Sequence, residues 1–235
     1  MTALLRDRWA GLDVVVGGGS DGKGGGDGPL LVLLHGFGAP AEDLVPLAFH
    51  LKLPAGTRTV CPGAPLALGM PFSDARAWSM IDLARLERLR DDAWSRETPS
   101  GLESARAKLV ALLGECETRL GAAPERTAIG GFSQGAMLAT DVVLATDRPC
   151  AGLVVFSGTL IAEPVWAARM PARRGLRVFQ SHGTEDPLLP YFVAERMRMM
   201  WEAAGADVTF VGFPGGHEIP REAVSGAERF LGDAL

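Results

Sequence analysis

Residues 128–137 constrain this chain more than any other stretch of its sequence. They read Ala-Ile-Gly-Gly-Phe-Ser-Gln-Gly-Ala-Met, with an apolar run before them and an apolar helical pattern after them. Residues 131–135 match Gly-x-Ser-x-Gly, a pattern that forms a sharp turn between a strand and a helix. The glycines leave room where a Cβ would clash, so the turn presents the hydroxyl of Ser133 at the helix N-terminus.

A serine at such a turn faces backbone N–H groups and the positive end of the helix dipole. Both would stabilise a developing oxyanion. The same five residues also fit a plain glycine-flanked turn whose serine has no chemical role. The rest of the chain must decide between these interpretations.

Apolar runs alternate with helical patterns along most of the sequence. Residues 30–34 are Leu-Leu-Val-Leu-Leu, typical of a strand buried on both faces of a parallel sheet. Further strands are predicted before Ser133 and at 12–16, 57–61, 152–157, 176–180 and 208–211. Helices are predicted after Ser133 and at 41–51, 77–92, 100–120, 191–204 and 221–235. This alternation predicts one α/β domain over residues 1–235, with a doubly wound, mostly parallel sheet.

A glycine-rich segment at residues 17–28 is predicted to be a flexible connection. Its glycines at 17, 19 and 22 satisfy a dinucleotide-binding pattern, and residues 17–23 nearly satisfy a phosphate-loop pattern. Both patterns need a helix directly afterwards, to present its N-terminus to phosphate. Here more glycine, Pro29 and a strand follow, so neither nucleotide site is expected.

Composition excludes several other classes of function. A net charge of −5 and scattered Lys and Arg residues provide no surface for nucleic acid. The apolar runs are too short for a membrane span or a signal peptide. Three dispersed cysteines indicate neither a disulfide framework nor a metal site. We therefore expect a cytoplasmic protein without metal or cofactor.

Ser133 needs a base, because an alcohol is a weak nucleophile until its proton is removed. The chain has four histidines. His50 ends a predicted helix, whereas His35 and His182 precede glycines at strand ends, where imidazoles often bond to loop backbone. His217 lies in a glycine-rich loop after the last strand and is the predicted base.

An acid should orient the imidazole of His217 and stabilise the imidazolium. Asp186 follows a predicted strand, and Pro187 stiffens the turn after it. Glu185 is its neighbouring competitor, and Asp207 is disfavoured because it opens a strand. Reactive groups of such sheets collect beyond the carboxyl ends of the strands, where Asp186 is expected to meet His217 and Ser133.

Two backbone N–H groups are predicted to stabilise the oxyanion. One belongs to Gln134, the residue after the nucleophile. The other belongs to Phe37, in the loop after the 30–34 strand, where Gly36 lets the backbone turn towards the site.

Several motifs together carry a resemblance to a known family. They lie at residues 34–38 (Leu-His-Gly-Phe-Gly), 130–135 (Gly-Gly-Phe-Ser-Gln-Gly), 157–158 (Ser-Gly), 182–187 (His-Gly-Thr-Glu-Asp-Pro) and 215–217 (Gly-Gly-His), with a weaker one at 75–78 (Ala-Arg-Ala-Trp). From about residue 29 onwards, the chain resembles α/β-hydrolases of the phospholipase/carboxylesterase family. This group includes acyl-protein thioesterases and small bacterial carboxylesterases.

The resemblance implies an α/β-hydrolase fold with a minimal lid, and hydrolysis of esters or thioesters through a serine acyl-enzyme without cofactor. Ser133, Asp186 and His217 match its catalytic triad, and Phe37 and Gln134 match its oxyanion donors. Members of the family often form homodimers. Phe37 stands where a smaller aliphatic residue is usual, which puts the acyl-chain preference in question.

The predicted function is hydrolysis of short- to medium-chain acyl esters, with thioesters as a second class. Apolar residues of the 66–78 loop, represented by Met70 and Trp78, and Leu188 beyond the acid are predicted to line the acyl pocket. Each could equally be a core residue. The alternatives are an acyltransferase that uses the same acyl-enzyme, and a ligand-binding protein on a hydrolase fold without turnover.

Overall fold

The computed structural model describes residues 4–69, 74–81 and 92–235. An eight-stranded sheet runs through it in the order β1-β2-β4-β3-β7-β8-β9-β10. Its strands are β1 (Leu5–Trp9), β2 (Leu12–Gly18), β3 (Leu30–Leu34), β4 (Arg58–Pro62), β7 (Thr127–Phe132), β8 (Gly152–Phe156), β9 (Arg177–Gly183) and β10 (Asp207–Phe213). The neighbours from β4 to β10 pair in parallel, whereas β2 joins β1 and β4 antiparallel.

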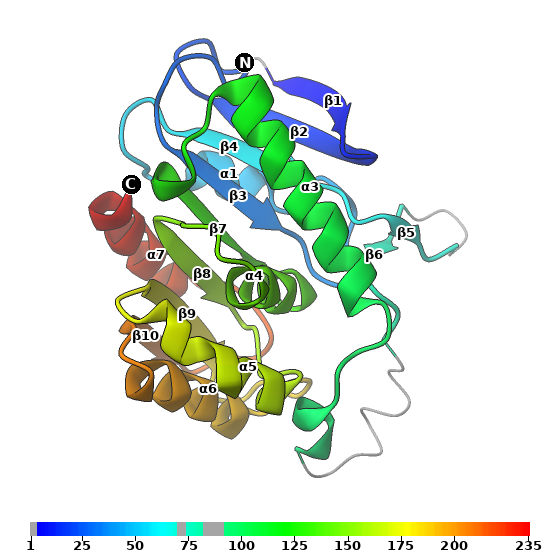
Figure 1. Cartoon of the computed structure of the whole chain (residues 1–235), viewed down its shortest axis with the longest axis vertical. Helices are drawn as coiled ribbons and strands as arrows, with labels where there is room; N and C mark the ends of the chain where they lie inside the picture. The colour runs from blue at the N-terminus through cyan, green and yellow to red at the C-terminus, as the bar shows by residue number, and fades with distance from the viewer. Residues whose placement is uncertain (1–3, 70–73, 82–91) are drawn as a thin grey trace.

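Helices cover both faces of this sheet (Figure 1). One face carries α3 (Leu102–Leu120), α4 (Gln134–Ala145), α5 (Glu163–Arg169) and α6 (Tyr191–Ala203), and the other carries α1 (Val45–His50) and α7 (Arg221–Ala234). Alternate residues of β3 belong to different apolar clusters, with Val32 on the α3 face and Leu31 on the α7 face. A strand buried on both sides needs apolar residues at every position, which explains the continuous run at 30–34.

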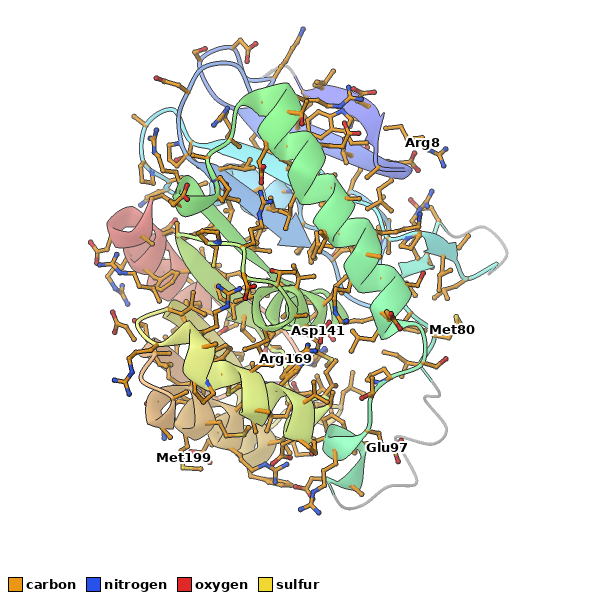
Figure 2. All side chains as sticks on the ribbon, in the orientation of Figure 1. Arg8, Met80, Glu97, Asp141, Arg169 and Met199 are labelled. Carbon is orange, nitrogen blue, oxygen red and sulfur yellow. The ribbon has the colours of Figure 1, made fainter. Side chains whose placement is uncertain are left out.

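Asp141 of α4, labelled in Figure 2, bonds to side chains of α3 and α5 on the same face of the sheet. Its carboxylate lies 2.6 Å from Arg106 Nε of α3 and accepts a hydrogen bond of 3.1 Å from Trp166 Nε1 of α5. The Asp141 side chain is 1% exposed. Loss of these donors would leave a buried carboxylate unpaired, which is strongly destabilising.

Several elements differ from the sequence-based prediction. β1 was not predicted, because its exposed Arg-Asp-Arg centre hides the apolar pattern of a strand. α5 was predicted as a connection because it contains proline, but that proline lies in the first turn, where its missing N–H costs no intrahelical bond. β9 continues to Gly183, beyond the predicted end, and pairs there with Phe213.

The helix predicted at 77–92 is wrong at its start. Arg76–Ala77 form the short strand β6, which pairs with β5 (Leu66–Ala67). The backbone of Arg76 also bonds Gly38 and Ala39 of the loop after β3, so tertiary contacts replace the helical bonds. Residues 82–91 lie outside the described residues, and the 3-10 helix η1 (Ala93–Arg96) follows them.

Specific hydrogen bonds hold the glycine-rich segment 17–28. The buried guanidinium of Arg58 donates to the carbonyls of Gly26 and Gly28, and Asp21 accepts from two backbone N–H groups within the segment. The sequence does not indicate these bonds, because Arg58 lies in a different strand. The flexibility predicted for this segment stays a prediction.

Candidate active site

The turn between β7 and α4 requires glycine on both sides of Ser133. A Cβ on Gly131 would lie 2.3 Å from the carbonyl oxygen of Leu34, and one on Gly135 would lie 2.1 Å from the same atom. Only glycine therefore lets α4 approach the end of β3 so closely. This is the steric role predicted for these glycines from the sequence.

Ser133 has a strained backbone, with φ 53° and ψ −119°. A conformation so rare for a residue with a Cβ costs about 1–3 kcal/mol and is found mostly at functional sites. Ser133 is also the N-cap of α4, yet its side chain makes no capping hydrogen bond. Within the described part of the chain its hydroxyl has no hydrogen-bond partner, which leaves it free for chemistry.

Asp186 and His217 lie together beyond the ends of β9 and β10. Asp186 Oδ2 is 2.7 Å from His217 Nδ1, and the His217 side chain is 13% exposed. The imidazole packs against Phe132, the residue before Ser133, with ring centroids 4.8 Å apart. Because Nδ1 is occupied by Asp186, Nε2 is the nitrogen left for proton exchange. The structure contains no hydrogen bond between His217 and Ser133, both of which it describes.

Hydrogen bonds keep the Asp186 carboxylate ionised. Burial alone would raise its pKa, but bonds from His182, His217 and the N–H of Leu189 outweigh burial and hold that pKa well below its usual range. The other oxygen, Oδ1, accepts from the N–H groups of Leu188 and Leu189, each at 2.9 Å. Glu185, the competing acid, is exposed, and no described residue bonds to its carboxylate.

We expect ionised Asp186 to stabilise the fold at neutral pH. Its pKa is lower in the folded state, so this contribution is complete above the unfolded-state value of about 4 and is lost as the pH falls from there towards the folded-state pKa. Asp186→Asn should therefore lower the free energy of unfolding at pH 7, and by less as the pH falls below about 4. Urea unfolding of both proteins across this range measures the difference, and a constant difference would contradict the expectation.

Two other histidines bond to backbone at strand ends. The N–H of Ala64 donates to His35 Nε2, so His35 Nδ1 carries the hydrogen and donates to the Gly36 carbonyl at 2.8 Å. Burial lowers the pKa of His35, which keeps the ring neutral. His182 Nε2 donates to the Leu189 carbonyl at 2.8 Å and lies 3.3 Å from Asp186 Oδ2. Both rings therefore fix loops that surround the site.

The two predicted oxyanion donors lie on neighbouring segments. Gln134 is the first residue of α4, so its N–H has no acceptor within the helix. Neither this N–H nor that of Phe37 has a backbone partner among the described residues. A Cβ on Gly36 would lie 3.4 Å from the Cβ of Ser133, which shows how closely the Phe37 loop approaches the turn at Ser133.

The residues predicted to line an acyl pocket have different environments. Trp78 is 2% exposed and belongs to the core cluster on the α3 face, which is the alternative that the sequence left open. Leu188 is 62% exposed on the surface beside Asp186, and its contact with substrate stays a prediction. Met70 lies outside the described residues.

Ser157 is a site residue to which the sequence assigned no role. It follows β8 with a positive φ of 46°, and its hydroxyl donates to the carbonyl of Glu218 at 2.9 Å. That bond holds the loop carrying His217. A serine directly after a buried strand was the available signal, because a polar side chain at such a position usually has a specific partner.

No helix of the described residues is long and apolar enough to cross a membrane. The described residues also contain no cluster of three His, Cys, Asp or Glu side chains arranged for a metal ion.

Comparison with known proteins agrees with this geometry. Residues 23–234 match the sequence profile of the Phospholipase/Carboxylesterase family. Acyl-protein thioesterase 1 of Eremothecium gossypii is 32% identical over 171 residues, which are 70% of this chain and 68% of that protein. Acyl-protein thioesterase 1 of Mycosarcoma maydis is 29% identical over 182 residues, which are 71% of this chain and 72% of that protein. The crystal structure of esterase PE8 has a TM-score of 0.80 at 28% identity, covering 95% of this chain and 99% of that one.

The parallel sheet with helices on both faces and the serine turn after β7 define an α/β-hydrolase fold. This chain belongs to the phospholipase/carboxylesterase family, whose profile spans nearly its whole length. It is an enzyme of the hydrolase class. The fold class and the family predicted from the sequence are both confirmed.

Proposed function

We propose that this protein hydrolyses carboxylic esters with short- to medium-chain acyl groups, and thioesters of the same acids, through an acyl-enzyme on Ser133. His217 is the general base, and Asp186 orients its imidazole. The N–H groups of Phe37 and Gln134 form the oxyanion hole. The substrate is a small molecule, and we place the reaction in the cytoplasm.

In the first half-reaction, Ser133 Oγ attacks the carbonyl carbon while His217 Nε2 takes the hydroxyl proton. The carbonyl oxygen becomes an oxyanion that the two N–H groups stabilise. Asp186 accepts from Nδ1–H and stabilises the imidazolium. The intermediate then collapses, and His217 returns the proton to the departing alcohol or thiol.

In the second half-reaction, water attacks the acyl-enzyme and His217 Nε2 takes a proton from it. The new tetrahedral intermediate expels Ser133 Oγ, which recovers a proton from the imidazolium. The products are the free carboxylic acid and the unchanged enzyme.

The observation that carries this proposal is the pairing of Asp186 with His217 beside a strained serine whose hydroxyl has no structural role. A ligand-binding protein without turnover would gain nothing from that strain. The bond between His217 and Ser133 is absent from this structure, but in hydrolases it often forms only with substrate in place. Relatives named acyl-protein thioesterases support the thioester half of the proposal.

A substrate panel tests the proposal. We expect kcat/KM for p-nitrophenyl esters to be highest with short or medium acyl chains and to fall with long ones. Matched acyl thioesters should be cleaved with the same order of chain preference, because both substrates give the same acyl-enzyme. A maximum at long chains would contradict the proposed acyl range.

Product analysis with added alcohols and amines separates hydrolysis from acyl transfer. We expect the free acid to remain the main product. If the acceptor captured most of the acyl groups, the enzyme would be an acyltransferase.

A further inference from the structure

Trp78 lies between the two segments that supply the oxyanion donors. Its indole Nε1–H donates to the carbonyl of His35 at 2.9 Å, and its backbone N–H donates to the side-chain Oε1 of Gln134 at 3.0 Å. With 2% of its surface exposed, Trp78 has almost no area to offer a substrate.

On one side, this arrangement fixes the start of α4. The side-chain Nε2 of Gln134 donates to the Ser79 carbonyl at 2.8 Å and lies 3.2 Å from the Ser79 hydroxyl. Both ends of this amide are therefore bonded to the segment 78–79, and the side chain is buried. The backbone N–H of the same residue is the proposed oxyanion donor, so a side chain bonded to Trp78 holds that donor in place.

The contacts of Trp78 and its neighbours also fix the loop after β3, which carries Phe37. His35 lies two residues before Phe37, and its ring is 5.6 Å from the Trp78 ring. Two residues before Trp78, the backbone of Arg76 makes two hydrogen bonds to this loop. Its carbonyl accepts from the Gly38 N–H at 2.9 Å, and its N–H donates to the Ala39 carbonyl at 3.0 Å. The residues on both sides of Phe37 are thus bonded to the segment 76–78.

We propose that Trp78 is a positioning residue, which holds the N–H groups of Phe37 and Gln134 at the separation that an oxyanion requires. This inference rests on the proposed function. It replaces the acyl-pocket role predicted for Trp78 from the sequence with an effect on the reaction that does not depend on the acyl group.

The expected effect follows from how strictly an oxyanion hole depends on geometry. Loss of one donor typically lowers kcat by about 10²–10³-fold. A displacement of about 1 Å caused by a residue outside the reacting groups can cost about 10²-fold. Trp78→Phe keeps an aromatic ring at this position but loses the indole N–H and part of the ring volume, a loss of volume that the Trp166→Phe control shares. It should lower kcat by roughly 10- to 100-fold with little change in KM.

The experiment compares Trp78→Phe with the parent enzyme on p-nitrophenyl esters of graded chain length. We expect the same fractional loss of kcat at every chain length. A trifluoromethyl ketone, whose adduct with serine places an oxyanion in the hole, should lose affinity by a similar factor. A carboxylate product, which forms no such adduct, should bind as before.

Trp166→Phe is the matched control. Trp166 is also fully buried and donates its indole N–H to a side chain, that of Asp141, at 3.1 Å. This variant should lose stability and keep kcat within about twofold, as expected for a change away from the reacting groups. Should Trp78→Phe not fold, Gln134→Met leaves Trp78 in place and breaks the other link, the bond from the Trp78 backbone N–H to Gln134 Oε1. It should show the same uniform loss.

A loss that varies with chain length would assign Trp78 to the acyl pocket and overturn the inference. A loss no larger than that of Trp166→Phe would overturn it as well. Either result would leave the proposed function standing, provided that Ser133→Ala is inactive. If Ser133→Ala kept its activity, the proposed function itself would be contradicted.

Discussion

Replacement of Ser133 by alanine is expected to lower kcat for ester hydrolysis by roughly 10⁶-fold, the scale on which loss of a nucleophilic serine acts in triad hydrolases. The acyl-enzyme cannot form without Oγ, and only the slow reaction assisted by the oxyanion hole remains. Steady-state assays with a p-nitrophenyl ester measure the loss. Retention of more than a few per cent of activity would exclude Ser133 as the nucleophile.

The fold should survive this substitution. Alanine keeps the Cβ, so the strained backbone at residue 133 gains no new clash, and the hydroxyl that is lost bonds to no described residue. Ser181→Ala is the matched control, since Ser181 is a buried serine near the end of β9 whose hydroxyl also lacks a partner among the described residues. It should keep activity within about twofold, as for most changes away from the reacting groups.

Replacement of Asp186 by asparagine is expected to lower kcat by about 10⁴-fold. The amide can donate to His217 Nδ1, which shifts the imidazole proton to Nε2. The nitrogen that should accept the Ser133 proton would then already carry one. Stopped-time assays at pH 7, with circular dichroism to confirm folding, measure this effect.

Glu185→Gln tests the choice of acid directly, because it makes the same chemical change at the neighbouring position. Glu185 is exposed, and no described residue bonds to its carboxylate, so activity should stay within about twofold of the parent. If Glu185→Gln lost activity and Asp186→Asn kept it, the two assignments would have to be exchanged.

Motifs with strong local constraints could be predicted from the sequence. The run at 30–34 is typical of a strand buried on both sides, which the structure shows. The glycines around Ser133 predicted a turn whose tight packing the structure also shows. In both cases, the physical requirement lies within a few consecutive residues.

Features that depend on distant partners could not be predicted. A helix was predicted to start at Ala77 because the pairing of β6 with β5, and the bonds of Arg76 to the loop after β3, are not visible in the local pattern. The links of Trp78 to His35 and Gln134 could not be predicted either, because they exist only in the folded chain. An apolar residue near a site does not reveal by its identity whether it contacts substrate or supports the residues that do.

Labelling by a fluorophosphonate tests most directly the central claim that Ser133 is a nucleophile activated by His217. After incubation, intact-protein mass spectrometry should show one adduct, and peptide mapping should place it on Ser133. The adduct should form far more slowly in His217→Ala and Asp186→Asn. A folded parent enzyme that remained unlabelled, or carried the adduct on another residue, would contradict the claim.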